Sequence, residues 1–138
     1  MRNWTAAFKS YKNSGIYSVE TTEELASIEL SARNQGLAYL YIDLSGVTDK
    51  EALLQKIAGV LGFPSYYGGN WDALEECITD LSWLKAKGFV LVFDNADALV
   101  THNPQELQTL QSILRSAVAS WKSQKMPFYA FVARTAIQ

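Results

Sequence analysis

The hydrophobic and polar positions along the chain fall into two alternating patterns. Short apolar runs rich in β-branched and aromatic residues predict strands, and they cover residues 16–19, 37–42, 89–93 and 128–133. The runs at 37–42 and 89–93 are apolar at nearly every position, which is typical of strands buried on both faces of a parallel sheet. The sequence therefore predicts a sheet of about four strands.

Around these runs, apolar residues recur at helical spacing. Residues 4–11 predict a short amphipathic helix or a lid over the core, and further helices are expected at about 21–33, 48–62, 71–84 and 104–122. Thr21 with Glu24, and Thr48 with Glu51, have the spacing of a capping box, and Asn70 is a good N-cap. Because strands and helices alternate, we expect an α/β fold with a mostly parallel sheet covered by helices.

The composition is that of one folded domain spanning residues 1–138. The chain is 49% hydrophobic and 19% charged, which suits a packed core and argues against disorder. No apolar stretch approaches the roughly 20 residues of a membrane helix. The start lacks the apolar core of a secretory signal, so we expect a cytoplasmic protein that does not bind membranes. The net charge of −2 gives no support for direct nucleic-acid binding.

The chain holds few of the side chains that most enzyme chemistry uses. Cys77 is the only cysteine and His102 the only histidine. These counts exclude an internal disulfide framework, a cysteine-based zinc site and a multi-histidine metal cluster. We therefore expect no cofactor, no metal and no catalytic activity.

The helix expected from Trp71 has an apolar face and an acidic face. At 100° per residue, the buried face consists of Leu74, Cys77, Ile78 and Leu81. The opposite face carries four carboxylates, Asp72, Glu75, Glu76 and Asp80. No lysine or arginine occurs from residue 65 to residue 84, so the like charges at 72/76 and 76/80 repel. Ordinary solvated faces mix both signs of charge, so a binding surface is an alternative to a solvated face.

Two chemical roles for these acids are weaker alternatives. Carboxylates at i and i+4 can bind a hard cation, but calcium loops space their oxygen ligands more tightly around a turn. An acid–base pair would need burial to shift a pKa, and this face is expected to be exposed. The residues alone therefore favour a solvated face or a protein-binding surface over a metal site or an enzyme.

The segment before this helix combines aromatic residues with glycines. Tyr66 and Tyr67 each offer a large contact area at a small cost in entropy, and we expect one ring in the core and the other at a partner. Gly68 and Gly69 are expected to permit positive φ angles. The loop lacks the lysine and the serine or threonine of a P-loop, and it leads into an acidic helix that would repel an anion.

The run FPSYYGGNWDAL at residues 63–74 resembles the signature of the barstar family, intracellular inhibitors of ribonucleases. The resemblance covers about residues 38–134. The segment from Ile42 to Pro64 has the family's length, and Cys77 matches a family cysteine. Residues 1–37 then form an N-terminal extension that adds a strand and a helix. The resemblance implies an inhibitor whose loop and second helix plug a nuclease active site, with acids in the place of substrate phosphates.

The family's contact positions carry over residue by residue. Tyr66 and Asp72 match such positions, and Glu76 stands where the family has its dominant aspartate. Glu75 replaces a family tryptophan, and the place of a further contact acid is taken by about Ser116. The complete set of candidate partner-binding residues is Tyr66, Tyr67, Gly68, Asn70, Asp72, Glu75, Glu76, Asp80 and Ser116.

The partner that the resemblance implies is a ribonuclease or related toxin domain with a basic cleft. The chain would then be a stoichiometric intracellular inhibitor, or immunity protein. The changes at Glu75 and Ser116 keep an alternative open, in which a module of the barstar fold binds a partner that is not a nuclease.

Overall fold

A parallel sheet of four strands forms the centre of the computed structural model, which describes residues 2–64 and 68–134. The strands are β1 (Gly15–Val19), β2 (Ala38–Asp43), β3 (Phe89–Asp94) and β4 (Phe128–Ala133). Their order is β1-β4-β3-β2, and every neighbouring pair is parallel. The expected α/β class and the strand count are confirmed.

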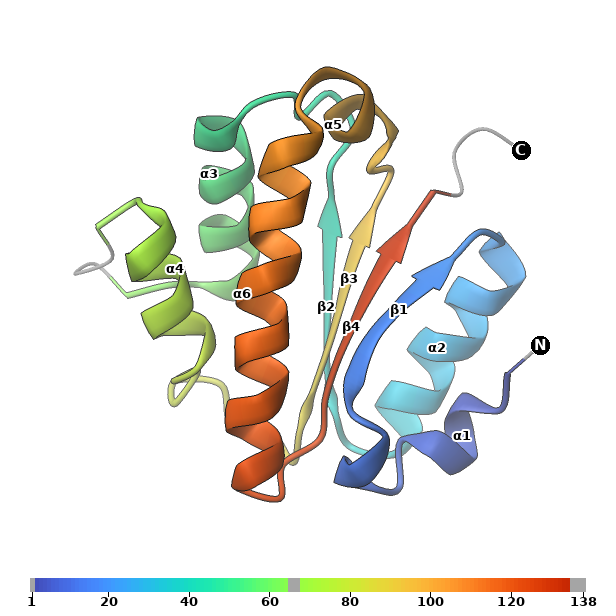
Figure 1. Ribbon diagram of the computed structural model, residues 1–138. Helices are drawn as coiled ribbons and strands as arrows, with labels where there is room; N and C mark the ends of the chain where they lie inside the picture. The colour runs from blue at the N-terminus through green and yellow to red at the C-terminus, as the bar shows by residue number, and fades with distance from the viewer. Residues whose placement is uncertain (1, 65–67, 135–138) are drawn as a thin grey trace.

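Helices cover both faces of this sheet (Figure 1). The helices are α1 (Trp4–Ala7), α2 (Thr22–Asn34), α3 (Lys50–Leu61), α4 (Trp71–Ile78), α5 (Asp97–His102) and α6 (Pro104–Ser123), with a short 3-10 turn η1 (Tyr11–Asn13). Buried residues of α3, α4 and α6 pack with Phe89, Leu91 and Phe93 in one core, whereas those of α1 and α2 pack with Val90 and Val92 in another. The period of two along β3 thus divides one apolar run between two cores.

The first residues of the chain close the second face of the sheet. Trp4 and Phe8 are buried, and both rings pack at steep angles against Phe131 of β4. The buried Tyr129 donates its hydroxyl proton toward the carbonyl oxygens of Ala7 and Ser10, each 2.7 Å away. Residues 4–11 are therefore a lid over the core, as expected.

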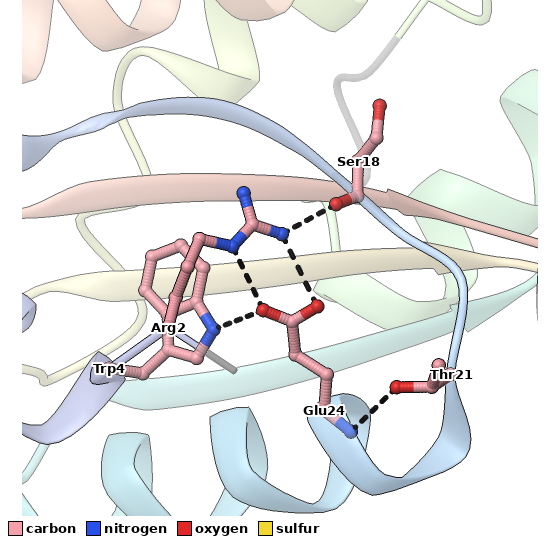
Figure 2. Close-up of polar contacts among 5 residues, drawn as sticks. All are labelled: Arg2, Trp4, Ser18, Thr21 and Glu24. Atoms are coloured by element: carbon pink, nitrogen blue, oxygen red, sulfur yellow. Dashed lines mark hydrogen bonds and ion pairs between the residues drawn. The ribbon is translucent and has the colours of Figure 1, made fainter.

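One carboxylate fastens this lid (Figure 2). Glu24 accepts hydrogen bonds from Arg2 Nε at 2.9 Å and from Trp4 Nε1 at 3.0 Å. Arg2 also donates to the Ser18 carbonyl of β1 at 2.7 Å. Thr21 Oγ1 accepts from the Glu24 amide, so only this half of the expected capping box forms, because the Glu24 side chain turns to Arg2 and Trp4. The Arg2 guanidinium lowers the pKa of Glu24.

The expected start of one helix was wrong, and one short helix was not expected. The N-cap of α3 is Asp49, whose Oδ1 accepts from the Ala52 amide at 2.9 Å, and the carbonyl of Thr48 instead accepts from Asn103 Nδ2. Both residue types cap well, and the aspartate sits at the position that reaches the free amide. Helix α5 was not expected, because its single turn and a half is too short to show a helical period.

Among the residues that the structure describes, none of the helices is both long enough and apolar enough to span a membrane.

Candidate functional site

Helix α4 begins where the sequence places it. Asn70 has an extended backbone, and its Oδ1 accepts a hydrogen bond from the Ala73 amide at 2.8 Å. Gly69, just before it, has a φ of +75°, which a side chain would strain. Leu74, Cys77 and Ile78 are buried, as the helical period predicts. The cap and the buried stripe therefore fix which face of α4 is turned to solvent.

The helix ends at Ile78, and the expected continuation to Leu84 was wrong. The Thr79 hydroxyl donates to the carbonyls of Glu75 and Glu76 in the last turn, at 2.8 and 3.2 Å. The amides of Asp80 and Leu81 donate to the Cys77 carbonyl. Leu81 adopts a φ of 45° and still buries its side chain. The apolar spacing was therefore kept by a left-handed turn and not by a longer helix.

The last carbonyl of α4 is held by a residue far along the chain. Trp121 of α6 donates its indole N–H to the Ile78 carbonyl at 3.0 Å inside the protein. Trp83, in the loop after α4, donates in the same way to the Leu61 carbonyl at the end of α3, at 2.9 Å. The two indoles tie α4 and its loop to both neighbouring helices, so the outward face of α4 is rigidly supported.

Four carboxylates occupy that outward face, and we call them the acidic surface: Asp72, Glu75, Glu76 and Asp80. All four are exposed, the first three on α4 and Asp80 in the turn after it. The ion pairs in the described part of the chain are Arg2–Glu24, Arg33–Glu29 and Arg134–Asp97, so no basic side chain neutralises the acidic surface there. It presents concentrated negative charge that is available to a partner.

The other candidate residues are placed less completely. Gly68 is exposed beside the start of α4. Ser116 is exposed on α6, the helix that packs against α4 (Figure 1). Tyr66 and Tyr67 lie outside the described residues, so their expected division between core and contact remains a prediction.

The lone cysteine of this helix is chemically quiet. Cys77 is 3% exposed, and burial raises the pKa of its thiol, with the Glu76 and Asp80 charges adding to the shift. A protonated, buried thiol is a poor nucleophile and a poor metal ligand. In residues 2–64 and 68–134, no three or more histidine, cysteine, aspartate and glutamate side chains are arranged to hold a metal ion.

A second polar cluster, which sequence analysis missed, lies where β2 and β3 end. Tyr41 donates its hydroxyl proton to the buried Asp94, and Asn95 Nδ2 donates to Asp43 at 2.8 Å. Bonds from Asn95 and Ser45 lower the pKa of Asp43. Because these carboxylates already accept several hydrogen bonds, the cluster reads as a structural junction between two strand ends. Its signal was an aspartate at the end of each of two adjacent strands.

The sheet and the acidic surface define a small α/β protein whose most distinctive feature is a charged, rigidly supported helix. Residues 37–133 match a family model described as Barstar (barnase inhibitor), and the chain belongs to the barstar family. This is a family of inhibitors. Comparison with curated proteins finds no match.

Solved structures resemble the fold at low sequence identity. They include the ORC2 protein of Aeropyrum pernix in its ADP form, at 13% identity and a TM-score of 0.60, where the match covers 98% of this chain and 42% of that chain. The ADPNP–ADP complexes of that protein match at 13% identity and a TM-score of 0.53, and the match covers 88% of this chain and 34% of that chain. Drosophila ORC bound to AT-rich DNA and Cdc6 matches at 15% identity and a TM-score of 0.52, and the match covers 97% of this chain and 44% of that chain. The chain spans less than half of those chains, and the likeness concerns the fold alone.

Proposed function

We propose that the chain is a stoichiometric inhibitor of a ribonuclease or related toxin domain, and that it acts in the cytoplasm as an immunity protein. In this proposal α4 enters the basic active-site cleft of the partner. The observation that carries the proposal is the acidic surface of a barstar-family chain. Three of its exposed carboxylates lie on α4 and the fourth in the turn after it, and none forms an ion pair with a basic side chain among the described residues.

The chemistry of a nuclease cleft explains why such a helix would fit. A ribonuclease binds phosphates with lysine, arginine and histidine side chains, and carboxylates on a helix offer the same sign of charge. Unneutralised charge also speeds encounter, because it attracts an oppositely charged cleft over about 8 Å at physiological ionic strength. Asp72, Glu75 and Glu76 need break no ion pair of their own among the described residues before they bind.

Rigid support adds to the fit. The Asn70 cap holds the start of α4, and the Trp121 indole holds its end, so little order has to be gained on binding. A preorganised helix loses less conformational entropy than a mobile loop, and more of the electrostatic attraction then appears as affinity.

A second candidate function rests on two positions. Ser116 is neutral and exposed on α6, and Glu75 is charged where the resemblance implies an aromatic contact. A partner that differs from the family's nuclease would fit these changes. The alternative is an interaction module of the barstar fold whose partner is a different basic protein.

The experiment compares charge reversal on two faces of the molecule. Asp72→Lys with Glu76→Lys reverses the acidic surface, and Glu20→Lys with Glu23→Lys makes the same change in net charge around the start of α2. All four residues are exposed, so both variants should fold. The wild-type chain is first used to capture its partner from the source organism, and the captured protein is then assayed for RNA cleavage with each variant.

We expect one wild-type chain to inhibit one nuclease, the α4 variant to lose inhibition, and the α2 variant to keep it. Inhibition that survives in the folded α4 variant would refute the proposed surface. A captured basic partner that does not cleave RNA, but still needs Asp72 and Glu76, would favour the second candidate function.

A further inference from the structure

A groove of about 450 Å³ lies at the edge of the sheet where β2, β3 and β4 begin. This edge is at the bottom of Figure 1, near η1 and the end of α6. Three lysines line the groove, Lys9, Lys87 and Lys125, and its described lining holds no acidic residue. The rest of that lining is polar (Ser10, Tyr11 and Gln35) or apolar (Phe8, Leu37 and Pro127). We call it the lysine groove. It is separate from the acidic surface, with which it shares no residue.

Two helices end beside the groove, and carbonyls in the last turn of each accept hydrogen bonds from backbone amides. At the end of α2, the amides of Gly36 and Leu37 donate to the carbonyls of Arg33 and Ala32, at 3.1 and 3.0 Å. At the end of α6, the amides of Lys125 and Met126 donate in the same pattern, each at 3.0 Å. Because backbone amides already donate to these four carbonyls, the lysines are not needed to satisfy them.

Lys125 occupies a position that normally favours glycine. Its φ is 60°, in the left-handed region, and the equivalent position after α2 is Gly36 with a φ of 75°. A side chain there strains the backbone, and glycine would adopt the same conformation freely. The chain thus keeps a lysine where the fold alone would prefer glycine, which points to a use for the ammonium group.

Lys87 and Lys9 reach the same groove from other parts of the chain. The Lys87 side chain lies against Gly36. A Cβ at Gly36 would be 3.4 Å from the Cδ of Lys87 and 3.8 Å from its Nζ. Lys9 follows α1. None of the three takes part in an ion pair within the described residues. Cations complement helix ends, but three unpaired lysines around one groove exceed what two capped helix ends require.

We propose that the lysine groove binds a compact polyanion that carries two or more phosphate groups. Each ammonium group offers three donors to phosphate oxygens, and Ser10 and Gln35 add neutral donors. The volume is that of a small-ligand pocket and not of a long groove for a polymer. This binding site is independent of the proposed inhibition, because the two surfaces have no residue in common.

The test uses isothermal titration calorimetry at low ionic strength with inorganic tripolyphosphate as the first probe. ATP is the second probe, and it separates a nucleotide from an inorganic source of phosphate, because Tyr11 offers a ring on which a base can stack. The variants are Lys9→Gln, Lys87→Met, which keeps the stem against Gly36, Lys125→Gly, and the triple variant. Lys50→Gln is the matched control, an exposed lysine that lines a different groove.

We expect wild type and Lys50→Gln to bind one tripolyphosphate equally well. Each single variant should weaken binding about tenfold, the effect of one charge-assisted hydrogen bond, and the triple variant should bind at least about a hundredfold more weakly. Tighter binding of ATP than of tripolyphosphate would identify a nucleotide as the source, and equal binding would identify an inorganic polyphosphate.

Thermal unfolding separates this role from a structural one. Lys125→Gly relieves the left-handed strain, so its melting temperature should equal or exceed that of wild type while phosphate binding falls. A lower melting temperature with unchanged binding would show that the lysine serves the helix end, and would overturn the proposal. It is also overturned if wild type shows no saturable binding, if Lys50→Gln weakens binding as much as the groove variants, or if a single-stranded RNA binds in place of both probes.

Discussion

Replacing Glu76 by alanine should stabilise the protein and weaken its binding to a partner. Glu76 lies in the last turn of α4, where the helix dipole is negative, and four residues after Asp72. Both relations are unfavourable for a carboxylate, and no basic side chain offsets them among the described residues. The side chain is exposed, so its removal leaves no cavity.

The size of the gain follows from these two relations. Relief of the like-charge pair contributes about 0.2–0.5 kcal/mol, and relief at the helix end about 0.3–1 kcal/mol. Glu76 and Asp80 do not form a second such pair within the helix, because Asp80 lies beyond the end of α4. A chain of 138 residues unfolds with an entropy of about 0.29 kcal/mol/K. A total of about 0.5–1.5 kcal/mol therefore raises the melting temperature by about 2–5 °C.

Calorimetric melting measures the stability, and a titration against the captured partner measures Kd. The matched control is Glu23→Ala, because Glu23 lies in the first turn of α2, where a negative charge is favourable. Its melting temperature should fall by about 1–3 °C while its Kd stays unchanged. The reasoning fails if Glu76→Ala melts lower than wild type, because the carboxylate would then hold a contact in the fold. It also fails if the partner binds this variant as tightly as wild type.

Two further predictions concern the supports of the fold. Trp121→Phe should lower the free energy of unfolding in a denaturant titration by about 1–3 kcal/mol, because it leaves the buried Ile78 carbonyl without its hydrogen bond. Trp83→Phe should lower it less, because the bond from Trp83 to the Leu61 carbonyl is only half buried. Equal losses would contradict this reasoning. Glu24→Gln should lower the melting temperature at neutral pH. Because the pKa of Glu24 is lowered in the folded state, its contribution to stability is present above the ordinary value of 4.5 and is lost as the pH falls through the folded pKa. The melting temperatures of wild type and Glu24→Gln should therefore converge in acid. A difference that stays constant with pH would refute this.

The fold was predictable where one local pattern decided the structure. The runs at 89–93 and 128–133 are apolar throughout, and only a strand covered on both faces buries such a run. Asn70 and Thr21 were recognisable as caps because their side chains bond to amides three residues on. The lid at residues 4–11 was visible in its aromatic spacing.

The sequence-based predictions were wrong where a residue distant in the chain determines the local structure. The end of α4 at Ile78 depends on the Trp121 indole, 43 residues away in the chain, and on a left-handed Leu81 that no spacing rule predicts. Glu24 kept the capping spacing, yet its carboxylate bonds to Arg2 and Trp4, which fold back from the N-terminus. Local propensity is overridden when tertiary contacts offer a better partner.

The candidate site divides in the same way. The charge of Asp72, Glu75 and Glu76 could be placed on one exposed face from the helical period alone. The support beneath that face could not, because Trp83 and Trp121 reach it from a loop and from another helix. The lysine groove had no sequence signal either, since its lysines come from residues 9, 87 and 125 and meet only in the folded chain.

Both proposed surfaces share a physical property that sets them apart from the core. Glu76 stands at the wrong end of a helix for a negative charge, and Lys125 stands in a conformation that glycine would adopt without strain. Neither residue is needed to pack or to satisfy a buried group, so the fold gains nothing from either cost. A feature that weakens the folded state and serves no contact within it is best explained by a contact outside it. The same argument predicts opposite changes in stability and in binding at each position, a combination that a residue with only a structural role would not produce.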